Sequence, residues 1–210
     1  MTTLVIWDVD GTLADSRPWI YASYRYAARA TGFPEPTDEE LGRHCCGGLL
    51  DNISTLFGLT GDKARAMGDL YRSYYAEECL DRVCTFNGVP EVLRELKDQG
   101  VKQAVATMKI QSAAEDLLGK LGILDCFTKV SGADLDGRIT KTQMIRSCME
   151  SIEHDRAVMI GDCPQDMQAA REAGAGFVAA MYGYGFSRER CMEEGVPYAD
   201  SPRDILRLIS

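Results

Sequence analysis

Residues 2–15, TTLVIWDVDGTLAD, contain the stretch that decides the fold of this chain. An unbroken apolar run at 4–7 is followed at once by Asp8, Asp10 and Gly11, a pattern typical of a strand buried on both faces of a parallel sheet. Side chains two positions apart on a strand point the same way, so we expect Asp8 and Asp10 to project together where the strand ends. Two such carboxylates repel each other beside a dry core unless a cation compensates. Asp and Gly are also common turn residues, and this stretch alone does not decide between a turn and a cation site.

Length and charge bound the class of protein. The 210 residues suffice for one large domain or two unequal ones, and a hydrophobic content of 45% suffices for a packed core. The formal net charge of -9 makes nucleic acid and anionic membrane surfaces poor partners. The N-terminal apolar run is too short for a signal peptide, and no run reaches the roughly 18 apolar residues of a membrane helix.

The eight cysteines and two histidines do not form a metal-binding pattern. No Cys-x-x-Cys pair occurs, so a structural zinc site is not expected. Without an export signal, we expect the thiols to be reduced core residues and the protein to be cytoplasmic.

The periodicity of the sequence changes near residue 86. Before it, apolar residues recur at helical spacing and predict helices at 19–30, 37–41, 49–57 and 62–80. After it, predicted strands at 102–107, 126–130, 157–160 and 176–181 alternate with predicted helices at 89–99, 112–121, 140–151, 164–173 and 203–209. Such alternation favours an α/β fold, a Rossmann-like and mostly parallel sheet with helices on both faces. We predict a core domain formed by 1–14 and 86–210, and a small α-helical domain, 15–85, inserted after the first strand.

Polar residues follow the predicted strands at their carboxyl ends, where open α/β sheets bind ligands. They are Asp8 and Asp10 after the first strand, Thr107 and Lys109 after the 102–107 strand, Asp162 and Asp166 after the 157–160 strand, and Lys141 at the start of the 140–151 helix. Each one alone has an ordinary explanation as a strand-end threonine, a surface lysine or a helix-capping aspartate. Together they place a hydroxyl, lysines and carboxylates on one edge of the sheet.

These residue types suit phosphoryl transfer through an aspartate. A carboxylate can attack phosphorus and form an aspartyl-phosphate. Mg²⁺ accepts carboxylate and phosphate oxygens as ligands and offsets the repulsion between them. A lysine and a hydroxyl can hold the phosphoryl oxygens, and a second carboxylate can protonate the leaving group and later activate water.

The sequence resembles the haloacid dehalogenase superfamily, in its phosphatase branch and specifically the phosphoglycolate phosphatase-like proteins. The resemblance rests on four motifs in order: DVDGT at 8–12, VATMK at 105–109, Lys141, and GDCPQD at 161–166. It implies that Asp8 is the nucleophile and Asp10 the acid/base. It further implies a phosphate site of Thr107 and Lys141, a helical cap domain at 15–85, and a Mg²⁺ site of Asp8, Asp10, Asp162 and Asp166.

Some positions depart from that pattern or fall where the branch varies. Met108 stands where asparagine or serine is common, which favours a less polar substrate group, and Thr142 stands where proline often follows the lysine. Arg43 and His44 fall where the branch places a specificity loop. Arg43 suits bidentate binding of a substrate carboxylate, although an ordinary surface arginine explains it at least as well, and His44 is expected to be a loop residue. Lys109 is either a positive charge at the mouth of the site or solvated.

The sequence therefore predicts an enzyme, a Mg²⁺-dependent phosphatase that hydrolyses a small, phosphoglycolate-like phosphomonoester through an aspartyl-phosphate. Open alternatives are a nucleotidase, a pyrophosphatase, a phosphomutase on the same fold, or a catalytically silent binding module. A sugar phosphomutase of this type carries a histidine early in the cap, but 15–30 contain none. A phosphonatase carries a cap lysine, but 20–59 contain none and Lys63 is the only lysine in the predicted cap. We expect a small phosphorylated metabolite as partner, no nucleic acid, no membrane, and a monomer or homodimer.

Overall fold

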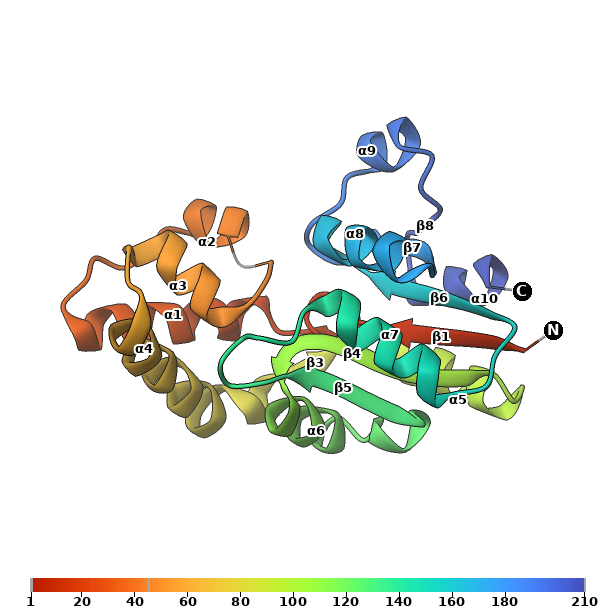
Figure 1. Ribbon diagram of the computed structural model, residues 1–210, viewed down its shortest axis with the longest axis horizontal. Helices are drawn as coiled ribbons and strands as arrows, with labels where there is room; N and C mark the ends of the chain where they lie inside the picture. The colour runs from red at the N-terminus through yellow and green to blue at the C-terminus, as the bar shows by residue number, and fades with distance from the viewer. Residues whose placement is uncertain (1, 45, 210) are drawn as a thin grey trace.

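The computed structural model, which describes residues 2–44 and 46–209, is built around a six-stranded parallel sheet in the order β5-β4-β1-β6-β7-β8 (Figure 1). The strands are β1 (Thr3–Trp7), β4 (Lys102–Ile110), β5 (Lys129–Ala133), β6 (Arg156–Gly161), β7 (Gly176–Ala180) and β8 (Tyr198–Ala199). β1 lies in the middle, where Trp7 aligns with Val105 on one side and Ile160 on the other. The predicted α/β fold with a mostly parallel sheet is confirmed.

Helices cover both faces of the sheet because alternate side chains of β1 point to opposite sides. Val5 and Trp7 pack in one apolar cluster, and Leu4 and Ile6 pack in another. The first cluster includes residues of α5 (Val89–Asp98), α6 (Gln111–Lys120) and α10 (Ile205–Leu208), and the second includes residues of α7 (Lys141–Ser151) and α8 (Pro164–Ala173). α9 (Arg188–Glu193), at the top of Figure 1, packs through Cys191 in a smaller apolar cluster with Met167 and Ala179.

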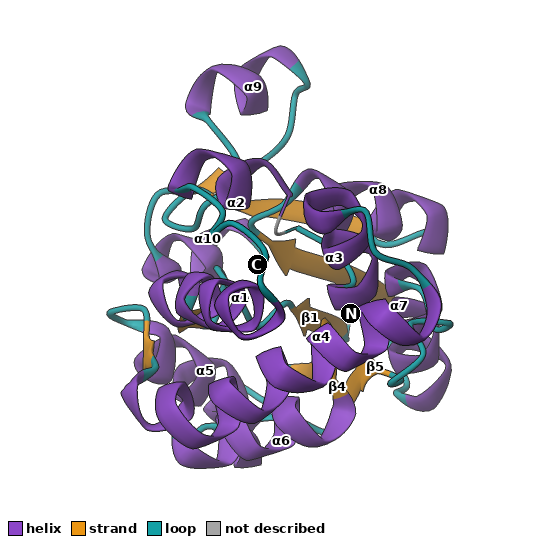
Figure 2. Ribbon diagram, turned by 90° about the vertical axis from the view of Figure 1, so that its left-hand side faces the viewer, coloured by secondary structure: helices purple, strands orange, loops and turns teal. Residues whose placement is uncertain are grey.

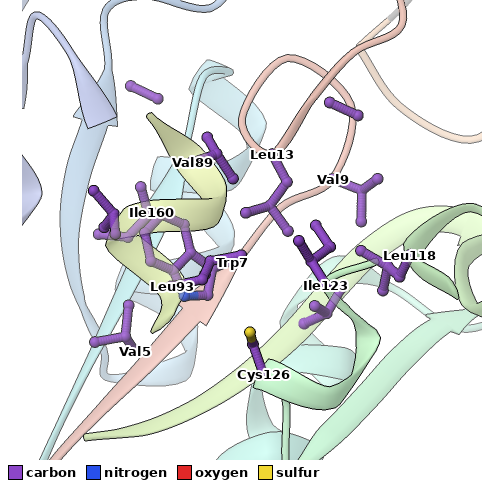
Figure 3. Close-up of a cluster of buried hydrophobic side chains, with 14 of the residues drawn as sticks. Val5, Trp7, Val9, Leu13, Val89, Leu93, Leu118, Ile123, Cys126 and Ile160 are labelled. Atoms are coloured by element: carbon purple, nitrogen blue, oxygen red, sulfur yellow. The ribbon is translucent and has the colours of Figure 1, made fainter. Parts of the chain in front are cut away.

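Trp7 is the largest side chain of the first cluster and is 1% exposed. Figure 3 shows it next to Leu93 and Ile160. Its indole Nε1 donates to Gln103 Oε1 (3.2 Å), and Gln103 Nε2 donates to the Leu93 carbonyl (2.9 Å). These bonds give partners to the side-chain polar groups that Trp7 and Gln103 bring into the core.

The residues between β1 and α5 form a group of helices beyond the carboxyl end of β1 (Figures 1 and 2). They are α1 (Arg17–Thr31), α2 (Asp38–His44), α3 (Leu49–Phe57) and α4 (Gly61–Tyr74), which continues through a π-helical turn (Tyr75–Cys79) and a 3₁₀ turn (Leu80–Arg82). Their own apolar cluster includes Tyr24, Leu41, Ile53 and Met67. Two short antiparallel strands, β2 (Ala14–Asp15) and β3 (Cys84–Thr85), pair where the chain enters and leaves this group. Separate folding of the predicted cap domain, 15–85, stays a prediction.

Several element bounds differ from those that the sequence predicts. A strand was expected at 126–130, but a 3₁₀ turn (Leu124–Cys126) occupies its start and β5 begins at Lys129. β5 runs through Gly132, where only a glycine fits because a side chain would collide with the backbone of Gln111. α2 reaches His44, within the segment expected to be a loop, and β2, β3, β8 and α9 were not predicted. Within the described residues, every helix is too short or too polar to cross a membrane.

Candidate active site

Asp8 and Asp10 lie at the carboxyl end of β1 in unequal surroundings. Asp8 continues the sheet, because its backbone N–H donates to the Ile160 carbonyl (2.9 Å), and its side chain is buried. The chain then turns at Gly11, where φ is +82° and a side chain would collide with the Asp162 carboxylate. The Asp10 carboxylate remains a quarter exposed. The turn thus places one carboxylate in the floor of the site and the other at its open side.

Lys141 is the first residue of α7 and reaches two of the buried carboxylates. Its Nζ lies 2.7 Å from Asp8 Oδ1 and 2.9 Å from Asp166 Oδ1. A capping box of Thr140 and Gln143 fixes the start of the helix and therefore the origin of the lysine side chain. Burial by itself lowers the pKa of Lys141, but the charges of Asp166 and Asp8 outweigh it and hold the pKa above its usual value. The ammonium therefore stays charged.

Asp162 and Asp166 come from the connection between β6 and α8. Asp166 lies in the first turn of α8, where its Oδ2 accepts from the Cys163 backbone N–H (3.2 Å). Asp162 accepts from the Tyr184 backbone N–H (3.0 Å) and from the Thr12 hydroxyl (3.4 Å). Both side chains are buried, so each is held in one orientation by its donors.

The three buried carboxylates form a candidate metal site. Oxygen atoms of Asp8, Asp162 and Asp166 lie within 4.8 Å of one another. Burial, with the charges of Asp166 and Asp10, raises the pKa of Asp8 to about 7 against the lowering effect of Lys141, and burial also raises the pKa of Asp162 well above its usual value. The Lys141 ammonium pairs with two of these three carboxylates, and a divalent cation would offset the remaining negative charge. An all-oxygen ligand set of this kind fits Mg²⁺.

Thr107 and Asp10 complete the edge of the sheet. Thr107 is buried, its hydroxyl accepts from the Lys109 backbone N–H (3.2 Å), and the register of β4 against β5 shifts between Thr107 and Ile110. Asp10 receives the Ser16 hydroxyl on Oδ1 (2.6 Å) and lies 3.3 Å from Lys109 Nζ through Oδ2. The sequence predicts that Thr107 ends this strand. Instead Thr107 stands at an irregularity of β4, and three further strand residues follow it.

These polar groups line one cavity of about 630 Å³ between the sheet edge and the helical group. Its floor carries Asp8, Asp10, Thr107, Lys141, Asp162 and Asp166. The opposite wall comes from α1 through the π-helical turn, and the loop between α2 and α3 touches the core through Gln165, whose Nε2 donates to the Cys46 carbonyl (3.0 Å). The arrangement can hold a phosphoryl group between a carboxylate and an ammonium, beneath a roof.

The sequence pattern of the haloacid dehalogenase-like hydrolases matches residues 5–180, which include both acidic segments of this edge. The chain belongs to this family. The predicted superfamily is thereby confirmed.

The relatives of this chain carry several names. The chain is 33% identical over 185 residues to the tyrosine-protein kinase PtkA of Mycobacterium tuberculosis. The aligned residues make up 87% of this chain and 63% of that protein. The chain thus spans less than two thirds of the length of that relative. The chain is also 28% identical over 217 residues to the phosphoglycolate phosphatase of Vibrio vulnificus, and the aligned residues make up 98% of this chain and 95% of that protein. A solved structure of a predicted phosphatase from Clostridium acetobutylicum matches with a TM-score of 0.88 and 27% identity over 99% of each chain. The likeness to phosphoglycolate phosphatase-like proteins is confirmed.

The residues expected to set substrate specificity lie in different places. Met108 and Lys109 line the cavity, and Lys109 is buried rather than solvated, with its side chain 9% exposed. Arg43 does not line it: the side chain is exposed and pairs with Glu39 one turn earlier in α2. The longer α2 explains this, since helical spacing sets the arginine beside that glutamate. The side chain of His44 lies outside the described structure.

Several neighbours of the site were not predicted. Ser16 stands at the N-terminal end of α1, but its hydroxyl makes no cap bond and donates to Asp10 instead. Tyr184 lies in a Gly-Tyr-Gly segment, and Gly183 approaches so closely that a side chain there would collide with Gly11 and Asp162. Those two glycines around a tyrosine were the available sequence signal.

Proposed function

We propose that this protein is a Mg²⁺-dependent phosphatase that hydrolyses a small phosphomonoester through an aspartyl-phosphate. The observation that carries the proposal is the meeting of Asp8, Lys141 and the carboxylates of Asp162 and Asp166 at the floor of a roofed cavity. A dense cluster of buried carboxylates is costly unless it binds a cation or reacts.

In this mechanism Asp8 attacks phosphorus in line with the leaving oxygen. The phosphorus–oxygen bond to the alcohol breaks, and Asp10 supplies the proton that the alcohol takes away. Asp10 then removes a proton from water, which attacks the aspartyl-phosphate, releases inorganic phosphate and restores the Asp8 carboxylate. The side chains of Asp8, Asp162 and Asp166, with the backbone carbonyl of Asp10, would hold Mg²⁺, which supplies charge neutralisation at the phosphoryl oxygens.

Thr107 and Lys141 are proposed to hold the phosphoryl group. The Lys141 ammonium lies against the Asp8 carboxylate, where negative charge develops during transfer. The Thr107 hydroxyl stands on the same edge and already has a fixed backbone donor. Both groups are preorganised, so no large rearrangement precedes the reaction.

Asp10 differs from Asp8 in the way an acid/base requires. It is partly open to water, whereas Asp8 is buried. The Ser16 hydroxyl and the Lys109 ammonium orient its two oxygens separately. We further propose that residues 15–85 act as a cap that excludes bulk water, and that the protein works in the cytoplasm on a small phosphorylated metabolite, as a monomer or homodimer.

The test is phosphate release from a panel of phosphomonoesters with and without Mg²⁺. The panel includes phosphoglycolate, the substrate named for a relative, together with sugar phosphates, nucleoside monophosphates and pyrophosphate. Metal-dependent release that disappears in Asp8→Asn supports the proposal. A folded, Mg²⁺-binding protein that releases phosphate from no member would favour a binding module instead.

A further inference from the structure

The wall of the cavity opposite the carboxylates is mainly apolar. Within the described residues the apolar lining comes from α1, α2, α3, the 3₁₀ turn and the end of β4, among them Ile20, Leu41, Leu49, Leu80, Met108 and Ile110. The Cε methyl of Met108 lies against Gly48 of the α2–α3 loop, 3.5 Å from where a side chain on that glycine would begin. Met108 thus joins the floor of the site to its roof at the position where a polar residue was expected.

A row of tyrosine rings runs along this wall toward the reacting groups. The ring centroids of Tyr24 and Tyr71 are 4.7 Å apart, and those of Tyr71 and Tyr75 are 6.3 Å apart and nearly parallel. All three line the cavity. The Lys109 ammonium lies 4.2 Å from the Tyr75 ring centre and 3.3 Å from Asp10. The row therefore ends beside the group proposed to protonate the leaving alcohol.

Most of the cations that line the cavity are already paired with carboxylates. Among the described residues they are Arg17, which lies 3.8 Å over the Tyr184 ring, Arg72, which pairs with Asp69 (2.7 Å), Lys109, which pairs with Asp10, and Lys141, which pairs with Asp8 and Asp166. Asp51 and Asp116 add negative charge to the lining. Three of these four cations are therefore already paired with carboxylates, and the fourth, Arg17, lies against a ring, so the lining offers a substrate carboxylate little excess positive charge.

We propose that the leaving alcohol of the substrate carries an aromatic ring or a similarly broad apolar group, and that Met108 is a specificity-determining residue that contacts it. This inference rests on the proposed phosphatase function. A cavity of about 630 Å³ is of the size that holds drug-sized ligands, roughly 300–1,000 Å³. Glycolate is far smaller and carries a charge that this wall does not match. Aromatic pairing and apolar burial both favour a ring along the tyrosine row.

The experiment compares two esters that differ only by a ring. Ethyl phosphate and 2-phenylethyl phosphate have leaving alcohols of similar chemical reactivity, so the ratio of their kcat/KM values reports binding of the ring. We expect 2-phenylethyl phosphate to be preferred by at least about tenfold, since a single well-buried apolar group already contributes that much to discrimination. Phosphoglycolate should be no better than ethyl phosphate.

A pair of methionine variants locates the effect. Met108→Asn should lower the preference for the phenyl ester several-fold, because it places an amide where the ring is proposed to pack. Met192→Asn is the matched control, since Met192 is 65% exposed on α9 and does not line the cavity. Its preference should equal that of the unaltered protein. The ratio within one preparation is independent of how much protein is correctly folded.

The outcomes separate the inference from the function on which it rests. Equal or better turnover of ethyl phosphate or phosphoglycolate, with Mg²⁺ dependence and loss in Asp8→Asn, would overturn the apolar leaving group and leave the phosphatase intact. An unchanged preference in Met108→Asn would overturn the role of Met108. Release of phosphate from no ester would overturn both proposals.

Discussion

The Asp8 carboxylate lies in surroundings that disfavour its charged form. It is buried among other carboxylates, and its pKa is raised to about 7, first by burial. Asp8→Asn keeps the shape but removes the nucleophile, so we expect turnover to fall by at least about a thousandfold. Because the amide carries no charge, the metal-free variant should unfold at the same or a higher temperature than the unaltered protein at pH 8. Measurable turnover at a tenth of the original rate, after a second purification, would exclude Asp8 as nucleophile.

Lys109 is expected to affect catalysis by orienting the Asp10 carboxylate. Its ammonium lies 3.3 Å from Asp10 Oδ2 and over the Tyr75 ring, with little exposure to water. Lys109→Met preserves the length of the side chain but frees one oxygen of Asp10, so kcat should fall about ten- to a hundredfold. Steady-state kinetics should show a smaller change in KM. Lys97→Met is the control, since Lys97 forms an exposed pair with Asp125. Equal effects of the two substitutions would rule out a positioning role.

At the level of elements, the turn between β6 and α8 brings Asp162 and Asp166 to the site only because Gly161 lacks a side chain. A methyl group there would overlap the Asp166 carboxylate. Gly161→Ala should therefore displace that ligand and weaken Mg²⁺ binding by about ten- to a hundredfold, as measured by calorimetry. Gly119 in α6 has open space around it, so Gly119→Ala should leave binding unchanged and stabilise the fold by about 0.5–1 kcal/mol. Identical affinities in the two variants would contradict the steric argument.

The elements also show where sequence reasoning succeeds and where it ends. The local sequence pattern alone predicts the buried strand β1 and the acidic residues after it. It correctly places Asp8 and Asp10 at the end of that strand. Whether Arg43 faces the cavity depends on where α2 ends. Because the helix continues past Arg43, this side chain pairs with Glu39 one turn earlier. The Ser16 hydroxyl was free to cap α1 or reach Asp10, and only the tertiary position of Asp10 settles that choice. Contacts between distant segments, such as the hydrogen bond from the Tyr184 backbone N–H to Asp162, produce no periodic pattern in the sequence from which they could be predicted.

At the scale of the whole molecule, stability, pH and Mg²⁺ should be linked through the buried carboxylates. The folded protein raises the pKa of Asp8 to about 7 from a reference value of 3.8. Between these values the folded state holds a proton that the unfolded chain has lost, so without metal the free energy of unfolding falls as pH rises from about 4 to about 7. Mg²⁺ needs the deprotonated form, and its affinity should drop about tenfold for each pH unit below 7.

Mg²⁺ should therefore raise the melting temperature more at pH 8 than at pH 6, because ligand binding to the folded state stabilises it in proportion to the logarithm of affinity. Thermal unfolding with EDTA and with Mg²⁺ at both pH values measures the difference directly. Asp8→Asn supplies the control: it has no proton to exchange at that position, so its Mg²⁺-induced shift should be small and depend less on pH. A shift in the unaltered protein that is equal at pH 6 and pH 8 would mean that Mg²⁺ binds without displacing a proton from Asp8, and the metal would then have to be placed elsewhere among the carboxylates.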